Sequence, residues 1–158
     1  MYLIILILVL TAIDQLSKLY MYNMSGGEIG YSIPIINDFF RLTYIENHGG
    51  IFGVFQGKIS YFTIISIVLI AYVVITEIKN FKKYKFPIKL GISIITAGAL
   101  GNMIDRIFRG FVIDMIDFRG IWGFIFNVAD TYIHIGLYII LFTLIKDEYE
   151  KMKKNKKE

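Results

Sequence analysis

The sequence predicts an all-α membrane protein with four transmembrane helices, a small extracytoplasmic β-structure and an interfacial segment. Hydrophobic residues make up 56% of its 158 residues and charged residues only 19%, a balance typical of membrane proteins. The charges are also unevenly placed, because long stretches carry almost none and the C-terminal end carries many lysines. This length allows one unit of several spans, residues 1–158, rather than an anchor joined to a large soluble domain.

Four segments have the length and composition of membrane spans. A helix needs about 20 mostly apolar residues to cross a hydrocarbon core of about 30 Å. The segments that meet this condition are about 2–20, 59–78, 88–107 and 128–145. The first could instead be a cleaved signal peptide, but it lacks a basic leading region and has Asp14 near the expected cleavage site. We therefore interpret it as a span.

The lysines predict the orientation of these spans. The short loop between the second and third spans is rich in lysine, and so is the tail, residues 146–158. Because positive residues mark the cytoplasmic side, both termini should be cytoplasmic and segments 21–58 and 108–127 should face outward. Since the basic residues flank apolar runs, we expect them to contact membrane lipid and not nucleic acid.

Local patterns predict the structure of the outer segments and the packing of the third span. Residues 33–45 contain many β-branched and aromatic side chains, which predicts one or two short strands on the membrane surface. The glycine-punctuated, aromatic stretch 49–55 is typical of a segment lying in the interface. Small residues at 97–99 and 101 predict close packing of the third span against another helix.

Polar residues gather at the expected outer face. Placing an ionisable group in hydrocarbon costs about 2.5–3.5 kcal/mol of free energy on insertion scales, so each such group is expected to have a structural or functional role. The residues placed at or near this face are Asp14, Lys18, Asn47, Asn102, Asp105, Arg106, Asp114, Asp117, Asn127 and Asp130. A purely structural protein has little need for so many polar residues at one face, so we expect the functional site to lie here.

Some of these residues also have plain structural interpretations. Asn127 stands where a helix N-cap would, with Asp130 three residues later on the same face, so capping alone could account for both. Asp105 beside Arg106 is favoured as a local ion pair or a hydrogen-bonded brace.

Two further aspartates follow in the segment after the third span. Apolar neighbours on both sides of Asp114 indicate partial burial, which would raise the pKa of its carboxyl. Asp117 is expected to be a solvated loop charge.

Two aspartates brought together would supply peptidase chemistry. They cannot both ionise easily, so one stays protonated near neutral pH. The ionised carboxylate can take a proton from water while the protonated one donates a hydrogen bond to the scissile carbonyl. No metal and no covalent intermediate is required.

Other nucleophiles and metal sites are poorly represented. The chain has no cysteine, and Ser17 and Lys18 are adjacent and hence about 100° apart on a helix. His48 and His134 form no zinc-binding pattern, although His134 could hydrogen-bond Asp130 from the same helix face.

Five short blocks, in order along the chain, resemble the motifs of lipoprotein signal peptidase (signal peptidase II), a family of bacterial membrane aspartic peptidases. The blocks are Asp14-Gln-Leu-Ser-Lys18, Asn47-His-Gly-Gly-Ile-Phe-Gly53, Gly98-Ala-Leu-Gly-Asn102-Met-Ile-Asp105-Arg106, Gly110-Phe-Val-Ile-Asp114-Met-Ile-Asp117 and Phe126-Asn127-Val-Ala-Asp130. Each block is weak alone, but five in order are specific. The chain departs from the family pattern at His48-Gly49-Gly50, where a small polar residue, Gly and Ala are more usual, and at Tyr132, where a small Ser or Ala is common.

The resemblance implies an activity, a site and a location. The enzyme would remove signal peptides from diacylglyceryl-modified prolipoproteins in the bacterial cytoplasmic membrane, cleaving just before the lipidated cysteine, as a monomer without cofactor or metal. Its active site would lie near the outer face. The implied catalytic pair is Asp114 and Asp130, the implied substrate-binding residues are Asn47, Asn102, Arg106 and Asn127, and the implied structural supports are Asp14 and Asp105.

Three alternatives stay open on the residues alone. A magnesium-dependent lipid transferase or phosphatase would use Asp105, Asp114, Asp117 and Asp130 as ligands. A proton-coupled transporter would use the same carboxylates as a relay, although the cytoplasmic halves of the second and third spans offer few polar residues. A scaffold without activity would not depend on Asp114.

Overall fold

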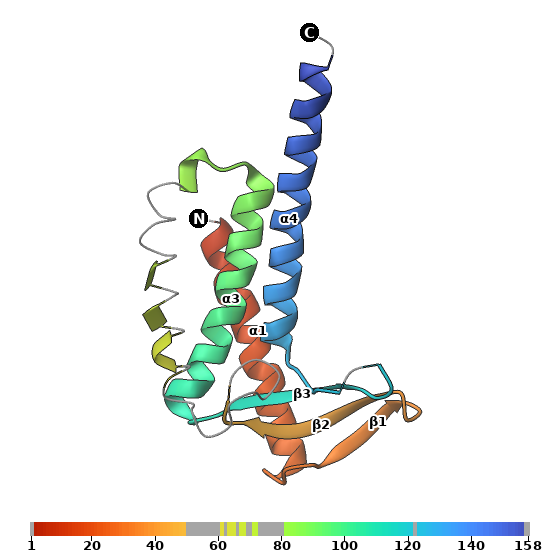
Figure 1. The fold of residues 1–158 in the computed structure, drawn as a ribbon. Coiled ribbons are helices and arrows are strands. Elements are labelled where there is room, and N and C mark those ends of the chain that lie inside the picture. Colours follow the sequence, from red (N-terminus) through yellow and green to blue (C-terminus); the bar gives the residue numbers. More distant parts are fainter. Residues whose placement is uncertain are drawn as a thin grey trace.

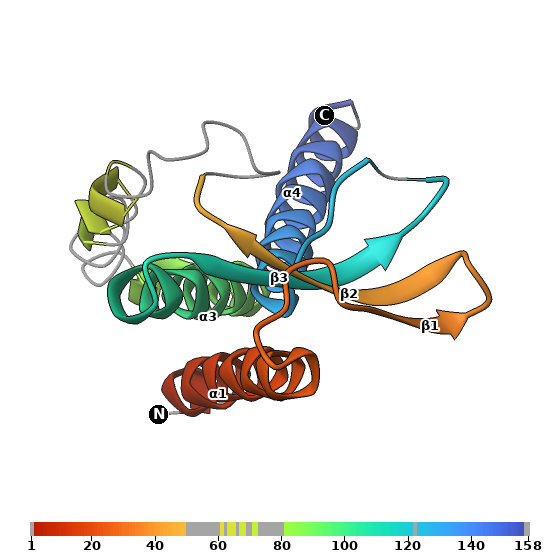
Figure 2. The same ribbon diagram turned by 90° about the horizontal axis from the view of Figure 1, so that it is seen from below.

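A computed structural model describes residues 2–49, 61, 63–65, 67–68, 71–72, 81–121 and 123–156. In chain order the elements are helix α1 (Tyr2–Ser25), strands β1 (Ser32–Ile36) and β2 (Phe40–Asn47), the 3-10 helix η2 (Phe81–Lys83), helix α3 (Phe86–Phe108), strand β3 (Val112–Phe118) and helix α4 (Val128–Asn155). Helices α1, α3 and α4 lie side by side, and a small sheet lies across one end of them (Figures 1 and 2).

Three of the four predicted spans are confirmed as helices long and apolar enough to cross a membrane, namely α1, α3 and α4. Their outer surfaces carry large exposed apolar side chains such as Leu8, Leu16 and Phe142, as expected of helices that face lipid. The predicted second span, 59–78, and the interfacial stretch 49–55 lie largely outside the described residues, and the described positions within 59–78 are helical. Helix α4 continues past the predicted end of its span to Asn155, so most of the lysine-rich tail is helical.

The sheet is antiparallel with the strand order β1-β2-β3. Strands β1 and β2 confirm the short strands predicted for residues 33–45, and the two pair as a hairpin. Asn37 adopts a positive φ of 47° in its turn, which asparagine tolerates well. Strand β3 comes from the segment that the sequence indicated only as a loop, and it pairs Asp114 with Ile45 and Val112 with Asn47. A bridge between Ile116 and Phe126 then holds the chain beside β3 just before α4 begins.

A small apolar core fixes the sheet to the helices. Met21 of α1, Tyr44 of β2, and Ile113 and Met115 of β3 form one buried cluster. Because this cluster joins α1 to the two strands that carry site residues, it positions the sheet directly over the helix ends.

Close packing of α3 and α4 depends on glycine, as the small residues of the third span predicted. A Cβ added at Gly136 would lie 2.6 Å from the carbonyl oxygen of Gly91, and one added at Gly91 would lie 2.6 Å from a side-chain carbon of Ile140. At the sheet end, Gly98 faces the carbonyl oxygen of Ala129 in the same way. The two helices therefore touch backbone to backbone along much of their length.

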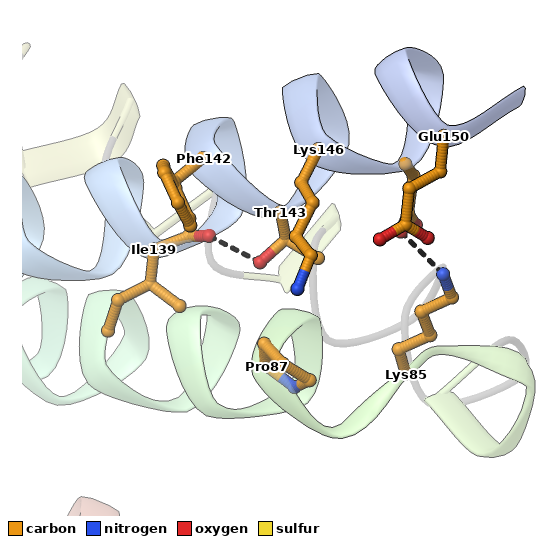
Figure 3. Close-up of a pocket in the computed structure, with 8 residues that line it drawn as sticks. Lys85, Pro87, Ile139, Phe142, Thr143, Lys146 and Glu150 are labelled. Atoms are coloured by element: carbon orange, nitrogen blue, oxygen red, sulfur yellow. Dashed lines mark hydrogen bonds and ion pairs between the residues drawn. The ribbon is translucent and has the colours of Figure 1, made fainter. Parts of the chain in front are cut away.

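At the end away from the sheet, an ion pair joins the same two helices (Figure 3). Lys85, just before α3, lies 2.5 Å from Asp147 of α4, beside a pocket whose lining includes Pro87, Ile139 and Phe142. The Lys85 side chain is 63% exposed, so solvent screens the pair.

Replacing Lys85 with methionine should lower the free energy of unfolding by less than about 1 kcal/mol. Thermal unfolding in detergent measures this, and a much larger loss would show that the pair holds the helices together.

Candidate functional site

The two predicted catalytic aspartates lie at the sheet end of the helices and share one network of hydrogen bonds. Asp114 lies on β3 and is 4% exposed, and Asp130 lies in the first turn of α4. The Nδ2 of Asn127 donates to Oδ1 of Asp114 at 2.6 Å and to Oδ1 of Asn102 at 3.1 Å. The Nδ2 of Asn102 in turn donates to Oδ1 of Asp130 at 2.8 Å. Two carboxamides thus connect the two carboxylates.

A third asparagine approaches Asp114 from the sheet. The Nδ2 of Asn47, at the end of β2, donates to Oδ2 of Asp114 at 3.0 Å, while its own Oδ1 accepts from the N–H of Gly49 at 2.9 Å. Asp114 therefore receives an amide hydrogen on each carboxylate oxygen, one from Asn47 and one from Asn127.

Asn127 also caps α4, as its position in the sequence predicted. Its Oδ1 accepts from the backbone N–H of Asp130 at 2.9 Å, and the Asp130 carboxylate accepts from the backbone N–H of Asn127 at 3.3 Å. This is a complete capping box. Asn127 therefore serves both roles at once. Its Oδ1 caps the helix, and its Nδ2 takes part in the polar network.

Burial raises the pKa of Asp114 to about 7, from an ordinary value near 3.8. Loss of hydration is the main cause, the negative charge of Asp130 adds to it, and the hydrogen bonds from Asn47 and Asn127 oppose it. The burial agrees with the apolar neighbours of Asp114 in the sequence. Near neutral pH, part of Asp114 is therefore protonated and can act as an acid.

Beneath this network lies a buried cluster of ions. The Nζ of Lys18 lies 2.9 Å from Oδ2 of Asp14 and 2.9 Å from Oδ2 of Asp105, and all three side chains are 0% exposed. Arg109 makes a second ion pair with Asp105. Among the described residues, Asp105 therefore pairs with Lys18 and Arg109, and not with its sequence neighbour Arg106.

The two acids of this cluster also bind the backbone beside each predicted catalytic residue. Oδ1 of Asp14 accepts from the N–H of Ala129 at 2.9 Å, and Oδ2 of Asp105 accepts from the N–H of Ile113 at 3.3 Å. Ala129 directly precedes Asp130 and Ile113 directly precedes Asp114. The cluster thus fixes the main chain from which both aspartates project.

Three residues in or beside this cluster have no role predicted from the sequence, namely Lys18, Gln15 and Arg109. Lys18 was placed at the outer face without a role, although its spacing of four from Asp14 on a helix was a usable signal. The Nε2 of Gln15 donates to Oδ1 of Asp105 at 3.1 Å, and Arg109 donates to Oε1 of Gln15 at 3.0 Å. Nothing local in the sequence indicated that Gln15 and Arg109 would meet.

Arg106 lies next to Asn102 on α3. Its Nη1 donates to the backbone oxygen of Asn102 at 3.4 Å, and its Nε is buried and has no acceptor among the described residues. A buried donor without a partner costs free energy, so this N–H is available to a bound molecule.

The expectation that Asp117 is a solvated charge is wrong. It lies on β3, is 8% exposed, and accepts from Oγ1 of Thr43 at 2.7 Å and from Nε of Arg119 at 3.3 Å. Pairing of β3 with β2 is what buries it. His134 contacts the backbone oxygen of Asp130 at 2.8 Å and thus braces the first turn of α4.

The ligand set of the magnesium alternative does not come together in the part of the chain that the structure describes. No three histidine, aspartate or glutamate side chains there gather as a metal site. Asp105 is paired with Lys18, and Asp117 is bound by Thr43 and Arg119.

Comparison with known proteins gives a consistent picture. Residues 6–146 match the family model described as signal peptidase (SPase) II. Two curated relatives named lipoprotein signal peptidase are that of Fusobacterium nucleatum, 46% identical over 87% of this chain and 82% of its own, and that of Clostridioides difficile, 41% identical over 88% and 95%. A solved structure described as a bacterial membrane enzyme, determined by the in meso method at 2.3 Å resolution, superposes with a TM-score of 0.81 at 34% identity, covering 95% of this chain and 91% of that one.

Proposed function

The chain belongs to the signal peptidase II family, and from this premise we propose how it removes signal peptides from lipoproteins. Its substrates are diacylglyceryl-modified prolipoproteins, which it cleaves just before the lipidated cysteine. Asp114 and Asp130 are the catalytic pair. The observation that carries this assignment is the connection of their carboxylates through the carboxamides of Asn127 and Asn102.

The reaction needs one proton shared by the two aspartates. Ionised Asp130 takes a proton from a water molecule, and the water oxygen adds to the carbonyl carbon of the residue before the cysteine. Protonated Asp114 donates a hydrogen bond to the carbonyl oxygen and stabilises the charge that develops there. When the C–N bond breaks, the proton that Asp130 took from water passes to the departing amino group of the cysteine, and the signal peptide leaves with a new carboxyl group.

Four residues bind the substrate in this proposal. Asn47, Asn102 and Asn127 surround the carboxylates, and Arg106 presents an Nε–H that finds no acceptor in the described part of the chain. A backbone carbonyl of an extended signal peptide would satisfy that donor. Asp14 and Asp105 act as structural supports, through the N–H groups beside the catalytic pair.

The arrangement of the helices supports the membrane placement that we propose. The sheet and the site lie at one end of α1, α3 and α4, and the lysine-rich end of α4 points the opposite way (Figure 1). We place the lysine-rich end and both termini in the cytoplasm and the site near the outer face of the bacterial cytoplasmic membrane. Residues 59–78 supply the fourth span, and the enzyme works as a monomeric single domain of residues 1–158, in contact with membrane lipid and without a cofactor.

Cleavage of a defined substrate tests this function. Purified protein in detergent is incubated with a diacylglyceryl-modified prolipoprotein and, as a control, with the same chain lacking the lipid. The expected products are the free signal peptide and a chain whose first residue is the lipidated cysteine, identified by mass spectrometry, with and without a chelator. Cleavage at another bond, or activity lost in chelator and restored by Mg²⁺, would overturn the proposal.

The activity should fall as the pH rises through about 7. The pKa of Asp114 is raised to about 7, so its acid form persists to that pH and disappears above it. Because the free enzyme must hold this proton, kcat/KM should decline on the alkaline side with an apparent pKa near that value. A profile of initial rates from pH 5 to 9 measures it. A rate that keeps rising to pH 9 would contradict Asp114 as the acid.

A further inference from the structure

Lys18 uses one of its three hydrogens on a neutral group. An ammonium has three donors and no acceptor. Two of the three go to Asp14 and Asp105, and the third goes to Oδ1 of Asn102 at 2.9 Å. The ion pairs do not require this third hydrogen bond, which joins Lys18 on α1 to the asparagine network around the proposed catalytic pair.

That contact decides which way the Asn102 carboxamide faces. The oxygen and nitrogen of an asparagine side chain are nearly alike in shape, so the hydrogen-bond partners determine the orientation. Lys18 can only donate, and Asn127 also donates to the same atom at 3.1 Å. Two donors therefore meet the oxygen of Asn102, and its nitrogen is left to donate to Asp130 at 2.8 Å.

The opposite orientation would be unfavourable on both sides. The NH₂ group of Asn102 would face the ammonium of Lys18, and its oxygen would face the carboxylate of Asp130. The orientation of Asn127 is fixed independently, because its own Oδ1 accepts from the backbone N–H of Asp130. Of the two groups that donate to Oδ1 of Asn102, only Lys18 carries a full positive charge.

On this geometry, and on the function proposed above, we propose that Lys18 is a positioning residue of the peptidase reaction. Its buried ammonium holds the Asn102 carboxamide with the NH₂ group toward Asp130, and so keeps that carboxylate in place to receive a proton from water. Lys18 touches neither the reacting atoms nor the carboxylate of Asp130. It acts through Asn102.

A double-mutant cycle between Lys18 and Asn102 tests this. Because losing Lys18 alone would leave two buried carboxylates with one cation, the cycle is built in an Asp14→Asn background, where Lys18→Met leaves Arg109 paired with Asp105. We expect Lys18→Met to lower kcat about 10- to 100-fold when Asn102 is present, with little change in KM. In the Asn102→Ala background the same change should lower kcat by less than about twofold.

The controls separate this inference from the proposed function and from a folding effect. The double variant Lys85→Met with Asp147→Asn removes an exposed ion pair and should leave kcat unchanged. Equal loss of kcat from Lys18→Met in both backgrounds would overturn the proposal, because Lys18 would then act independently of Asn102. An inactive wild-type protein would instead overturn the proposed function.

A second variant covers the case in which the Met variants do not fold. Asn102→Asp keeps an oxygen for Lys18 and Asn127 to donate to, so the protein should fold, but it presents a second oxygen to Asp130. Its kcat should fall as far as that of Asn102→Ala. A folded Asn102→Asp protein with wild-type kcat would overturn the proposal, because the orientation that Lys18 imposes would then be irrelevant.

Discussion

Replacing Asp114 or Asp130 with asparagine should lower kcat by about 10²–10⁴-fold while the protein stays folded. Asparagine keeps the shape of the side chain and removes its ability to hold or accept a proton. At Asp114 the change also costs one hydrogen bond, because the new NH₂ group would face the NH₂ group of either Asn47 or Asn127. It also removes a charge that is costly to bury, so the net effect on stability should be small. Cleavage of the lipidated prolipoprotein measures the activity, and thermal unfolding in detergent measures the folding.

Asp117→Asn is the matched control for this experiment. Asp117 lies on the same strand and is also a buried carboxylate, but Thr43 and Arg119 bind it, and it has no contact with the asparagine network. Its variant should keep kcat within about tenfold of the wild type, the loss of a charged hydrogen bond being the only change. Equal losses from Asp114, Asp117 and Asp130 would instead point to carboxylates that act together on a metal ion. Normal cleavage by either Asp114→Asn or Asp130→Asn would rule out the proposed pair.

Gly98→Ala should lower both stability and activity. A Cβ at this position would meet the carbonyl oxygen of Ala129 at a distance that real Cβ atoms essentially never show, and backbone cannot move aside as a side chain can. Overpacking of this kind costs about 1–3 kcal/mol. Because Ala129 directly precedes Asp130, separating α3 from α4 here also pulls Asn102 from Asp130. A displacement of about 1 Å at a catalytic group can cost about 10²-fold in rate, so a loss of that order in kcat is expected.

Gly123→Ala is the corresponding control. Gly123 precedes α4 by a few residues. Apart from its chain neighbours, no atom of the described residues lies within 4 Å of an added Cβ, so its variant should match the wild type in melting temperature and kcat. A Gly98→Ala protein as stable and as active as the wild type would show that α3 and α4 are farther apart than the structure has them.

The parts of the molecule that depend on local sequence could be predicted from it. Apolar runs of sufficient length identified the three described spans, and the position of Asn127 before an apolar helix identified a cap. The apolar neighbours of Asp114 indicated its burial. In each case the governing interaction lies within a few residues along the chain.

The parts that depend on contacts between distant segments were missed. Strand β3 is buried at its first four positions, so it lacks the alternation by which a strand is recognised, and it exists because β2 pairs with it. The same pairing buries Asp117, which in isolation resembled a loop charge. Gln15 and Arg109 meet at Asp105 because α1 and α3 cross there, and no spacing within either segment reveals that meeting.

Asn127 both caps α4 and joins the polar network, and this affects when the site can form during membrane insertion. The side chain that completes the first turn of α4 is the same one that links Asp114 to Asn102, so the helix start and the proposed catalytic site depend on one residue. On the proposed function, a chain whose last span has not yet been inserted lacks Asp130, and its Asp114 lacks the amide from Asn127. On that function, we expect the peptidase to be inactive until its last span has been inserted.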